Sequence, residues 1–236
     1  FKKEKKPFFA IVQTSNNHRP YTIPVSDTDF VSITVSKDSL KKYGFESMEE
    51  LNAFRYSDYC FKTFIETAKK EDYFHNTIFV FIGDHGVAGN ADAVYPEAWT
   101  QQRLTDEHVP LLFYAPYLLE PQRRSETVSQ IDVLPTIAGL LARPYVNTTL
   151  GRDLLHPAKK YDMAFITNTV GKIGVVTNEF YYTKTLGLED REMVPVTDAP
   201  VWYSKTQADS IQNTLDQLTN AFYHTAQYLL LTNKQR

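Results

Sequence analysis

The stretch TIFVFIGDHG, residues 77–86, joins a run of mostly apolar, β-prone residues to a carboxylate, an imidazole and a glycine. A short apolar run that ends at turn residues is typical of a buried β-strand. A plain turn after such a strand needs only the glycine or the aspartate. The histidine beside them, His85 next to Asp84, therefore asks for a chemical explanation.

A second continuous apolar run follows at Val109–Tyr114. Because neither run alternates apolar with polar residues, and because a long segment separates them, they predict a parallel sheet covered on both faces. The predicted fold class is therefore α/β, a mostly parallel sheet sandwiched by helices. Its other predicted elements are a strand at Phe8–Gln13 and helices at Met48–Lys70 and Val133–Leu141.

The pattern changes after residue 163, where the short β-prone runs AFITNT, KIGVVTN and EFYYTKT are separated by Asn and Gly. Such runs predict antiparallel hairpins. Apolar residues from Ile211 to Leu229 then recur every three or four positions, which predicts an amphipathic helix packed on that sheet. We therefore expect two domains, an α/β core over residues 1–155 and a small antiparallel subdomain with a terminal helix over residues 156–236.

Composition narrows the possible partners of this chain of 236 residues. A formal net charge of −3 gives no electrostatic reason to expect nucleic acid. No window reaches the roughly 18–20 apolar residues of a membrane span, so we expect the chain itself to be soluble. A single cysteine, Cys60, rules out an internal disulfide framework. The charged opening FKKEKKPFFAIVQT leads abruptly into a strand, which suggests a fragment of a longer protein.

Asp84 and His85 follow the carboxyl end of a predicted strand, where ligands gather in open parallel sheets. A carboxylate beside an imidazole offers mixed oxygen and nitrogen ligation, which suits Mn²⁺ or Zn²⁺ better than an all-oxygen Ca²⁺ site. A hydrogen-bonded turn without a metal is the alternative reading of the same residues.

A second polar focus is His18, which lies beside Asn17 and Arg19 beyond the first predicted strand. Its imidazole can donate a hydrogen bond to an anionic oxygen or act as a general acid, although a solvated loop residue is the common case. His108 directly precedes a strand, where a structural hydrogen bond explains it equally well. We assign no role to the remaining histidines, His75, His156 and His224.

Four blocks in order resemble the sulfatase-like branch of the alkaline phosphatase superfamily, and most closely its bacterial lipoteichoic-acid synthases and phosphoglycerol transferases. The blocks are FFAIVQTSNNHRPY, RYSDYCFKTFIETAKKEDYFHNTIFVFIGDHG, HVPLLFYAP and SQIDVLPTIAGLL, and they span residues 8–142. The resemblance implies that Asp84 and His85 are metal ligands and that His18 and His108 bind the phosphate or sulfate of an anionic ester substrate. It also implies one divalent metal ion, Mn²⁺ or Zn²⁺ rather than Ca²⁺ or Mg²⁺.

The resemblance further implies that the nucleophile and an acidic metal ligand lie on an amino-terminal half outside this chain. We therefore expect no catalytic residue here, and an isolated chain that binds metal weakly and does not turn over substrate. Cys60 cannot replace the nucleophile, because it lies within the predicted helix of residues 48–70. The resemblance also implies a parent protein anchored in the bacterial membrane by amino-terminal helices, with its catalytic domain outside the cytoplasm.

The function implied for the parent is phosphoryl transfer of the phosphoglycerol-transferase type, through a covalent intermediate on a threonine outside this chain. Two enzyme alternatives share the scaffold, namely a sulfate-ester hydrolase and a phosphoethanolamine transferase. A non-catalytic binding module that kept the fold is the alternative outside enzymes. The identity of the absent nucleophile separates these alternatives, because threonine supports phosphoryl transfer and a modified cysteine or serine supports sulfate-ester hydrolysis.

Overall fold

The computed structural model describes residues 6–15, 17–156, 162–167, 171–199 and 201–233. It divides into two compact units, unit 1 over Phe1–Gln122 and unit 2 over Arg123–Arg236. The domain boundary predicted at residue 155 lies within unit 2 and stays a prediction. The first five residues of the charged opening run lie outside the described ranges.

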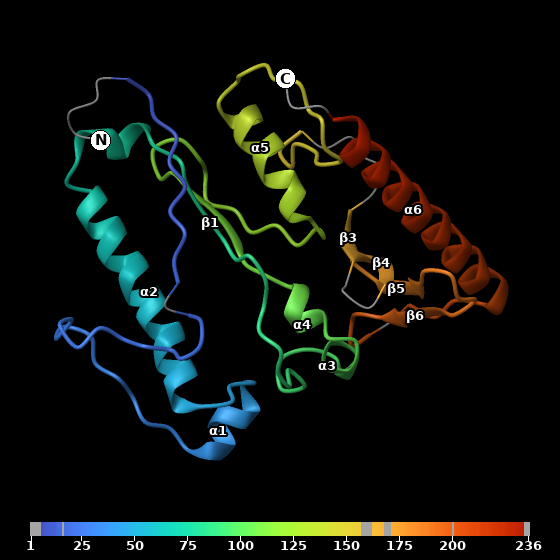
Figure 1. Ribbon diagram of the computed structural model, residues 1–236, viewed down its shortest axis with the longest axis horizontal. Coiled ribbons are helices and arrows are strands. Elements are labelled where there is room, and N and C mark those ends of the chain that lie inside the picture. The colour runs from blue at the N-terminus through green and yellow to red at the C-terminus, as the bar shows by residue number, and fades with distance from the viewer. Residues whose placement is uncertain (1–5, 16, 157–161, 168–170, 200, 234–236) are drawn as a thin grey trace. The chain divides into compact units, whose positions relative to one another are not determined.

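Unit 1 begins with a long loop and two helices, α1 (Lys37–Lys42) and α2 (Met48–Ala68), followed by the 3₁₀ helix η1 (Asp72–Asn76) (Figure 1). The Ser47 hydroxyl caps α2 by accepting the Glu50 N–H at 3.1 Å, as expected for a serine at this position. The predicted helix is thus confirmed, two residues shorter at its carboxyl end.

The two apolar runs of unit 1 form strands β1 (Phe79–Ile82) and β2 (Leu111–Tyr114), but the pair is antiparallel, with Ile82 opposite Leu111. The predicted parallel pairing is wrong for these strands. Parallel strands need a crossover that carries the chain to the far end of the sheet. The connection between them holds only the short helices α3 (Glu97–Gln101) and α4 (Leu104–Glu107), and it returns the chain to the end at which β1 finished.

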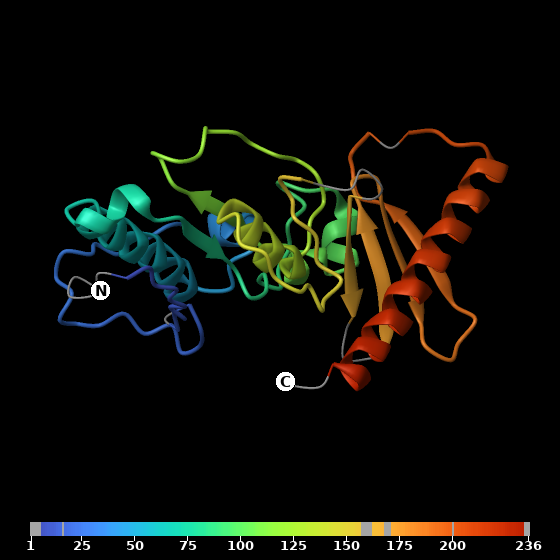
Figure 2. The ribbon, with the colours of Figure 1, turned by 90° about the horizontal axis from the view of Figure 1, so that it is seen from above.

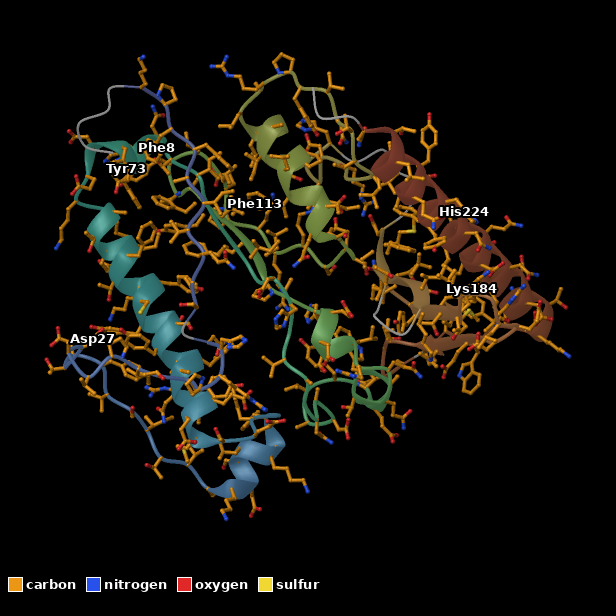
Figure 3. The ribbon with its side chains drawn as sticks, in the orientation of Figure 1. Phe8, Asp27, Tyr73, Phe113, Lys184 and His224 are labelled. Atoms are coloured by element: carbon orange, nitrogen blue, oxygen red, sulfur yellow. The ribbon has the colours of Figure 1, made fainter. Side chains whose placement is uncertain are left out.

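The strand predicted at Phe8–Gln13 does not form, which is a second correction. The Phe8 ring contacts the Tyr73 ring edge-on at 5.8 Å (Figure 3). Ile11 and Val12, however, are 83% and 75% exposed. A strand requires a neighbouring strand for its backbone hydrogen bonds, and in the described part of unit 1 the sheet contains only β1 and β2. The mostly parallel sandwich is therefore not seen among the described residues.

Unit 2 opens with the 3₁₀ helix η2 (Gln130–Asp132) and the helix α5 (Val133–Leu140), which confirms the predicted helix to within one residue. The Asp132 carboxylate, only 3% exposed, accepts the N–H of Ser129 and the N–H of Arg152, each at 2.9 Å. Because both of its oxygens are hydrogen-bonded, the buried charge is tolerated. It ties the start of the helical segment to a loop twenty residues further along the chain.

The predicted small antiparallel sheet is confirmed, and it has four strands paired in sequence order. They are β3 (Met163–Thr167), β4 (Lys172–Thr177), β5 (Phe180–Thr185) and β6 (Arg191–Pro195). Strand β6 is not predicted from the sequence, because its run REMVP is short, charged and ends in proline.

Helix α6 (Lys205–Thr232) covers one face of this sheet, as Figure 2 shows, and confirms the predicted terminal helix. Ser204 and Gln207 form a reciprocal capping box at its start. Leu215 of the helix packs with Met163, Val175 and Tyr182 of the sheet to form the core of unit 2. In the described residues, no helix is long and apolar enough to cross a membrane.

Candidate metal and substrate site

Asp84 and His85 begin the loop that leaves β1, as the sequence predicts. One carboxylate oxygen of Asp84 accepts the backbone N–H of His85 at 3.0 Å, which fixes the aspartate against its own turn. Both side chains are largely exposed, at 86% for Asp84 and 75% for His85. Exposed ligand atoms on a constrained turn are accessible to an incoming ion.

Gly86 brings this loop into close contact with helix α4. Its N–H donates to the Asp106 carbonyl at 2.7 Å. A Cβ atom at residue 86 would lie 1.8 Å from the Thr105 carbonyl oxygen and 2.9 Å from that of His108. Only glycine therefore permits this approach, which places His85 beside the segment that carries His108.

The imidazole of His85 has one nitrogen committed to the backbone. Nδ1 lies 2.8 Å from the Gly86 carbonyl oxygen, and because a carbonyl can only accept, Nδ1 carries the proton. In the neutral form of the ring, Nε2 carries the lone pair, and this atom lies 3.9 Å from Asp84 Oδ2. Both atoms are on exposed side chains and would be available to hold one metal ion. Histidines that bind metals typically donate their other ring N–H to a carbonyl or carboxylate in this way.

His108 lies between α4 and β2, at the amino end of the strand, as expected. Its ring meets Trp99 edge-on at a centroid distance of 5.1 Å and Tyr95 at 5.8 Å, and those two rings stack on each other at 4.3 Å. Partial burial lowers the pKa of the His108 imidazole. A neutral imidazole at pH 7 can both donate and accept a hydrogen bond.

Glu107 is an acidic residue near the loop of Asp84 and His85, and it was not predicted from the sequence. Burial and the nearby Asp106 carboxylate raise the pKa of Glu107, and the charges of Arg103 and His85 act against this rise. The feature of the sequence that could have indicated it is its position directly before His108, the first residue of the block HVPLLFYAP. Glu107 thus adds a carboxylate that interacts electrostatically with His85.

His18 lies in a turn of the long loop of unit 1, where its side chain is exposed. Its ring repeats the arrangement of His85, because Nδ1 lies 2.8 Å from the carbonyl oxygen of the next residue, Arg19. Nε2 is therefore the atom that His18 can present to a ligand. The role expected of His18, binding the substrate of a metal ion held by Asp84 and His85, stays a prediction. Over the ranges that the structure describes, no group of three or more His, Cys, Asp or Glu side chains is arranged to hold a metal.

The histidines without an assigned role contact nearby residues. The His75 ring lies 4.2 Å from that of Tyr117, His156 pairs with Asp153 at 3.1 Å, and the His224 ring lies 5.4 Å from that of Tyr223. Cys60 is half-buried within α2, in agreement with the predicted helix.

Two open hollows in unit 1, of about 460 and 730 Å³, lie away from the predicted site residues. The first is formed by α2 and the loop of residues 29–31, and the second by α1, the start of α2 and residues 89–90. Neither hollow is lined by Asp84, His85, His18 or His108, so shape alone does not mark the candidate site.

Known proteins include relatives that match most of this chain. Lipoteichoic acid synthase-like YvgJ of Bacillus subtilis (strain 168) is 26% identical over 227 residues, which are 91% of this chain and 35% of that protein. Lipoteichoic acid synthase of Staphylococcus saprophyticus is 23% identical over 215 residues, 88% of this chain and 31% of that protein. The chain therefore spans about a third of the length of these relatives.

Two solved structures have a similar fold. A protein in the alkaline phosphatase superfamily from Vibrio parahaemolyticus matches with a TM-score of 0.63 and 26% identity, over 94% of this chain and 51% of that one. The lipoteichoic acid synthase LtaP from Listeria monocytogenes matches with a TM-score of 0.64 over 92% of this chain and 52% of that one. Its 19% identity supports the fold alone.

A family model described as Sulfatase matches residues 1–142, which include His18, Asp84, His85 and His108. The match covers more than half of the chain. Together with the solved structures, it places the chain in the sulfatase family, with fold neighbours in the alkaline phosphatase superfamily.

Proposed function

We propose that the parent protein is a metal-dependent phosphoryl-group transferase of the phosphoglycerol-transferase type. The observation that carries the proposal is the pairing of Asp84 Oδ2 with His85 Nε2 at 3.9 Å, with the other ring nitrogen held by a carbonyl. Relatives named as lipoteichoic acid synthases support the phosphoryl branch of the family. Because the chain spans only about a third of those relatives, the activity is proposed for the parent and not for this chain alone.

Asp84 and His85 fit one divalent metal ion, and the imidazole nitrogen favours Mn²⁺ or Zn²⁺ over Ca²⁺ or Mg²⁺. When bound, such an ion polarises phosphoryl oxygens and lowers the pKa of a hydroxyl nucleophile. Two protein ligands are fewer than the three or four of most metal sites. We therefore propose that the amino-terminal half of the parent supplies an acidic ligand and a threonine nucleophile, and that the isolated chain is inactive.

The two remaining histidines contact the ester in this proposal. His18 presents Nε2 to a non-bridging or leaving oxygen of an anionic phosphate ester, which stabilises the charge that develops there. Burial lowers the pKa of the His108 imidazole, so the ring is neutral at pH 7. His108 contacts the substrate from the segment packed against the His85 loop. In this chain the residues bind and orient the substrate, and the covalent step occurs on the threonine supplied from outside it.

A sulfate-ester hydrolase is the second candidate function, because the matching family model carries the description Sulfatase. A calcium site is built from oxygen ligands. The imidazole at residue 85 therefore argues against a sulfatase with a calcium site and favours the phosphoryl branch. A phosphoethanolamine transferase would use the same residues with a different donor. We further propose that amino-terminal helices of the parent anchor it in a bacterial membrane, with this domain outside the cytoplasm.

The test compares two chromogenic esters on the purified full-length parent, bis(p-nitrophenyl) phosphate and p-nitrophenyl sulfate, with Mn²⁺ or Zn²⁺ added. We expect turnover of the phosphodiester alone, and loss of that turnover when either metal is chelated. Preference for the sulfate ester would establish the second candidate. Turnover of neither ester, with no metal bound, would identify a non-catalytic module and overturn the proposal.

A further inference from the structure

Tyr21 has an unusual backbone conformation three residues after His18. Its φ is +59°, a left-handed conformation that residues with a Cβ atom rarely adopt. Residues in such conformations persist only where their surroundings hold them, and they cluster at functional sites. Its N–H donates to the His18 carbonyl at 2.8 Å, which closes the turn that carries His18.

Two side chains hold this turn against the start of helix α2. The Tyr21 hydroxyl donates to Glu50 Oε1 at 3.2 Å, and the Arg19 guanidinium pairs with the Glu46 carboxylate. The Arg19 pair is exposed, at 69% and 61% of the two side chains, so solvent weakens it. The bond between Tyr21 and Glu50 is the better protected tie, because Glu50 is only 3% exposed.

Glu50 is unusual for a residue in the first turn of a helix. A glutamate at this position usually accepts the N–H of the capping residue, but its Oε2 instead accepts the N–H of Glu46 at 2.6 Å. Its other oxygen accepts the Tyr21 hydroxyl. One buried carboxylate thereby connects the residue before the cap to the turn of His18, twenty-nine residues earlier in the chain.

The His18 ring depends on the same turn for its orientation. Nδ1 donates to the carbonyl of Arg19, which lies between His18 and Tyr21 in the chain. A change in the backbone of this turn therefore rotates the carbonyl that fixes the ring. The direction of Nε2 follows from the conformation that Tyr21 and Glu50 maintain.

We propose that Tyr21 and Glu50 are positioning residues for His18, with the buried carboxylate holding the strained turn that aims Nε2 at the ester. The inference rests on the proposed function and adds two residues to it. In this proposal both residues act through the turn of His18 and not by direct contact with the substrate.

The experiment is a double-mutant cycle in the full-length parent with bis(p-nitrophenyl) phosphate as the probe. Tyr21→Phe and Glu50→Ala are each made alone and together with His18→Ala. We expect each single change to lower kcat/KM by about tenfold to 100-fold through kcat, since small misplacements of a catalytic group cost this much. In the His18→Ala background we expect neither change to lower it further, because coupled residues are not additive.

Glu50→Gln gives a conservative rescue, because its amide oxygen still accepts the Tyr21 hydroxyl while the Glu46 N–H loses its acceptor. We expect Glu50→Gln to recover part of the kcat that Glu50→Ala loses. The matched control is Tyr56→Phe, which removes another hydroxyl bond to a carboxylate from α2, to Asp27 at 2.9 Å. That change should lower the melting temperature and leave kcat/KM unchanged.

Losses from Tyr21→Phe and Glu50→Ala that persist in full in the His18→Ala background would overturn the inference and leave the proposed function standing. So would an unchanged kcat/KM in both single variants. If His18→Ala leaves cleavage of the ester unchanged, the role proposed for His18 is overturned, and this inference with it. If the unmodified parent does not cleave the ester, the proposed function is overturned as well.

Discussion

Unit 2 and unit 1 differ in how fully their large apolar side chains are buried. The largest side chains with less than 2% exposure all belong to unit 2, namely Tyr182, Ile173, Val175, Thr136 and Thr219. Among its described residues, unit 1 has no side chain of this size that is so fully buried, and Ile11 is 83% exposed there, although unit 2 also exposes Trp202 at 95% and Leu230 at 82%. The unit that holds the proposed chemistry is thus the one with the less complete apolar core.

The contrast follows from where the contacts of each unit come from. Every strand of unit 2 pairs with its neighbour in sequence, and α6 covers the sheet, so the core closes within about 70 residues. The fold neighbours of the whole chain are about twice its length. We therefore expect the apolar surface of unit 1 to be covered by the part of the parent that this chain does not span.

The largest effect should come from the core of unit 2. Leu215→Ala removes a side chain that is 5% exposed and packs on Met163, Val175 and Tyr182, so it should lower the free energy of unfolding by about 2–5 kcal/mol. Leu230 lies on the same helix at 82% exposure, and Leu230→Ala should change it by less than about 0.5 kcal/mol. Urea denaturation of the chain measures both, and equal effects would show that Leu215 does not close the core of unit 2.

A smaller and pH-dependent effect is expected at Asp216, which joins α6 to the sheet. Burial raises the pKa of this carboxyl, but hydrogen bonds from Lys184 at 2.9 Å and Tyr182 at 2.7 Å outweigh it and leave the pKa below its usual value. A lowered carboxyl pKa stabilises the fold above the unfolded value of about 3.9, and this contribution disappears as the pH falls through the folded pKa.

Asp216→Asn should therefore cost about 1.5–3 kcal/mol at pH 7, the range for hydrogen bonds to charged groups. Below about pH 4 the difference between the variant and the original chain should shrink. Urea midpoints at pH 7 and pH 3 measure this change. A difference that is constant with pH would show that the charge of Asp216 does not hold α6 on the sheet.

The smallest effect in this chain should come from unit 1. Ile11→Ala should change the free energy of unfolding by less than about 0.5 kcal/mol, because the side chain is 83% exposed. In the full-length parent the same substitution should cost more, since we expect the side chain to be covered there. A large loss in the chain alone would contradict the contrast, and so would a negligible loss in the parent.

The same contrast explains how much of the fold the sequence predicts. Helices α2, α5 and α6 and three strands of the antiparallel sheet follow from local periodicity and turn residues. The pairing of β1 with β2 depends on where the chain between them returns, which apolar composition does not encode. The run at Phe8–Gln13 has the composition of a strand, but no described strand of unit 1 pairs with it.

The candidate residues can be chosen from the sequence, but the geometry of their side chains cannot. The sequence predicts a metal at Asp84 and His85 because two ligand types follow one strand, and this stays a prediction. The commitment of Nδ1 to the next carbonyl in both His18 and His85 becomes visible only with the geometry of each turn. Glu50 is equally hidden, since a glutamate in a first helical turn is an ordinary feature of sequences.

The metal content of the purified full-length parent, measured by mass spectrometry, tests the central claim most directly. We expect about one Mn²⁺ or Zn²⁺ per chain, and a loss of most of it in Asp84→Ala and in His85→Ala. The control is Asp92→Ala, which removes an exposed carboxylate between β1 and α3 that accepts a hydrogen bond from the Thr100 hydroxyl. This variant should keep the metal. An unchanged metal content in both Asp84→Ala and His85→Ala would contradict the account.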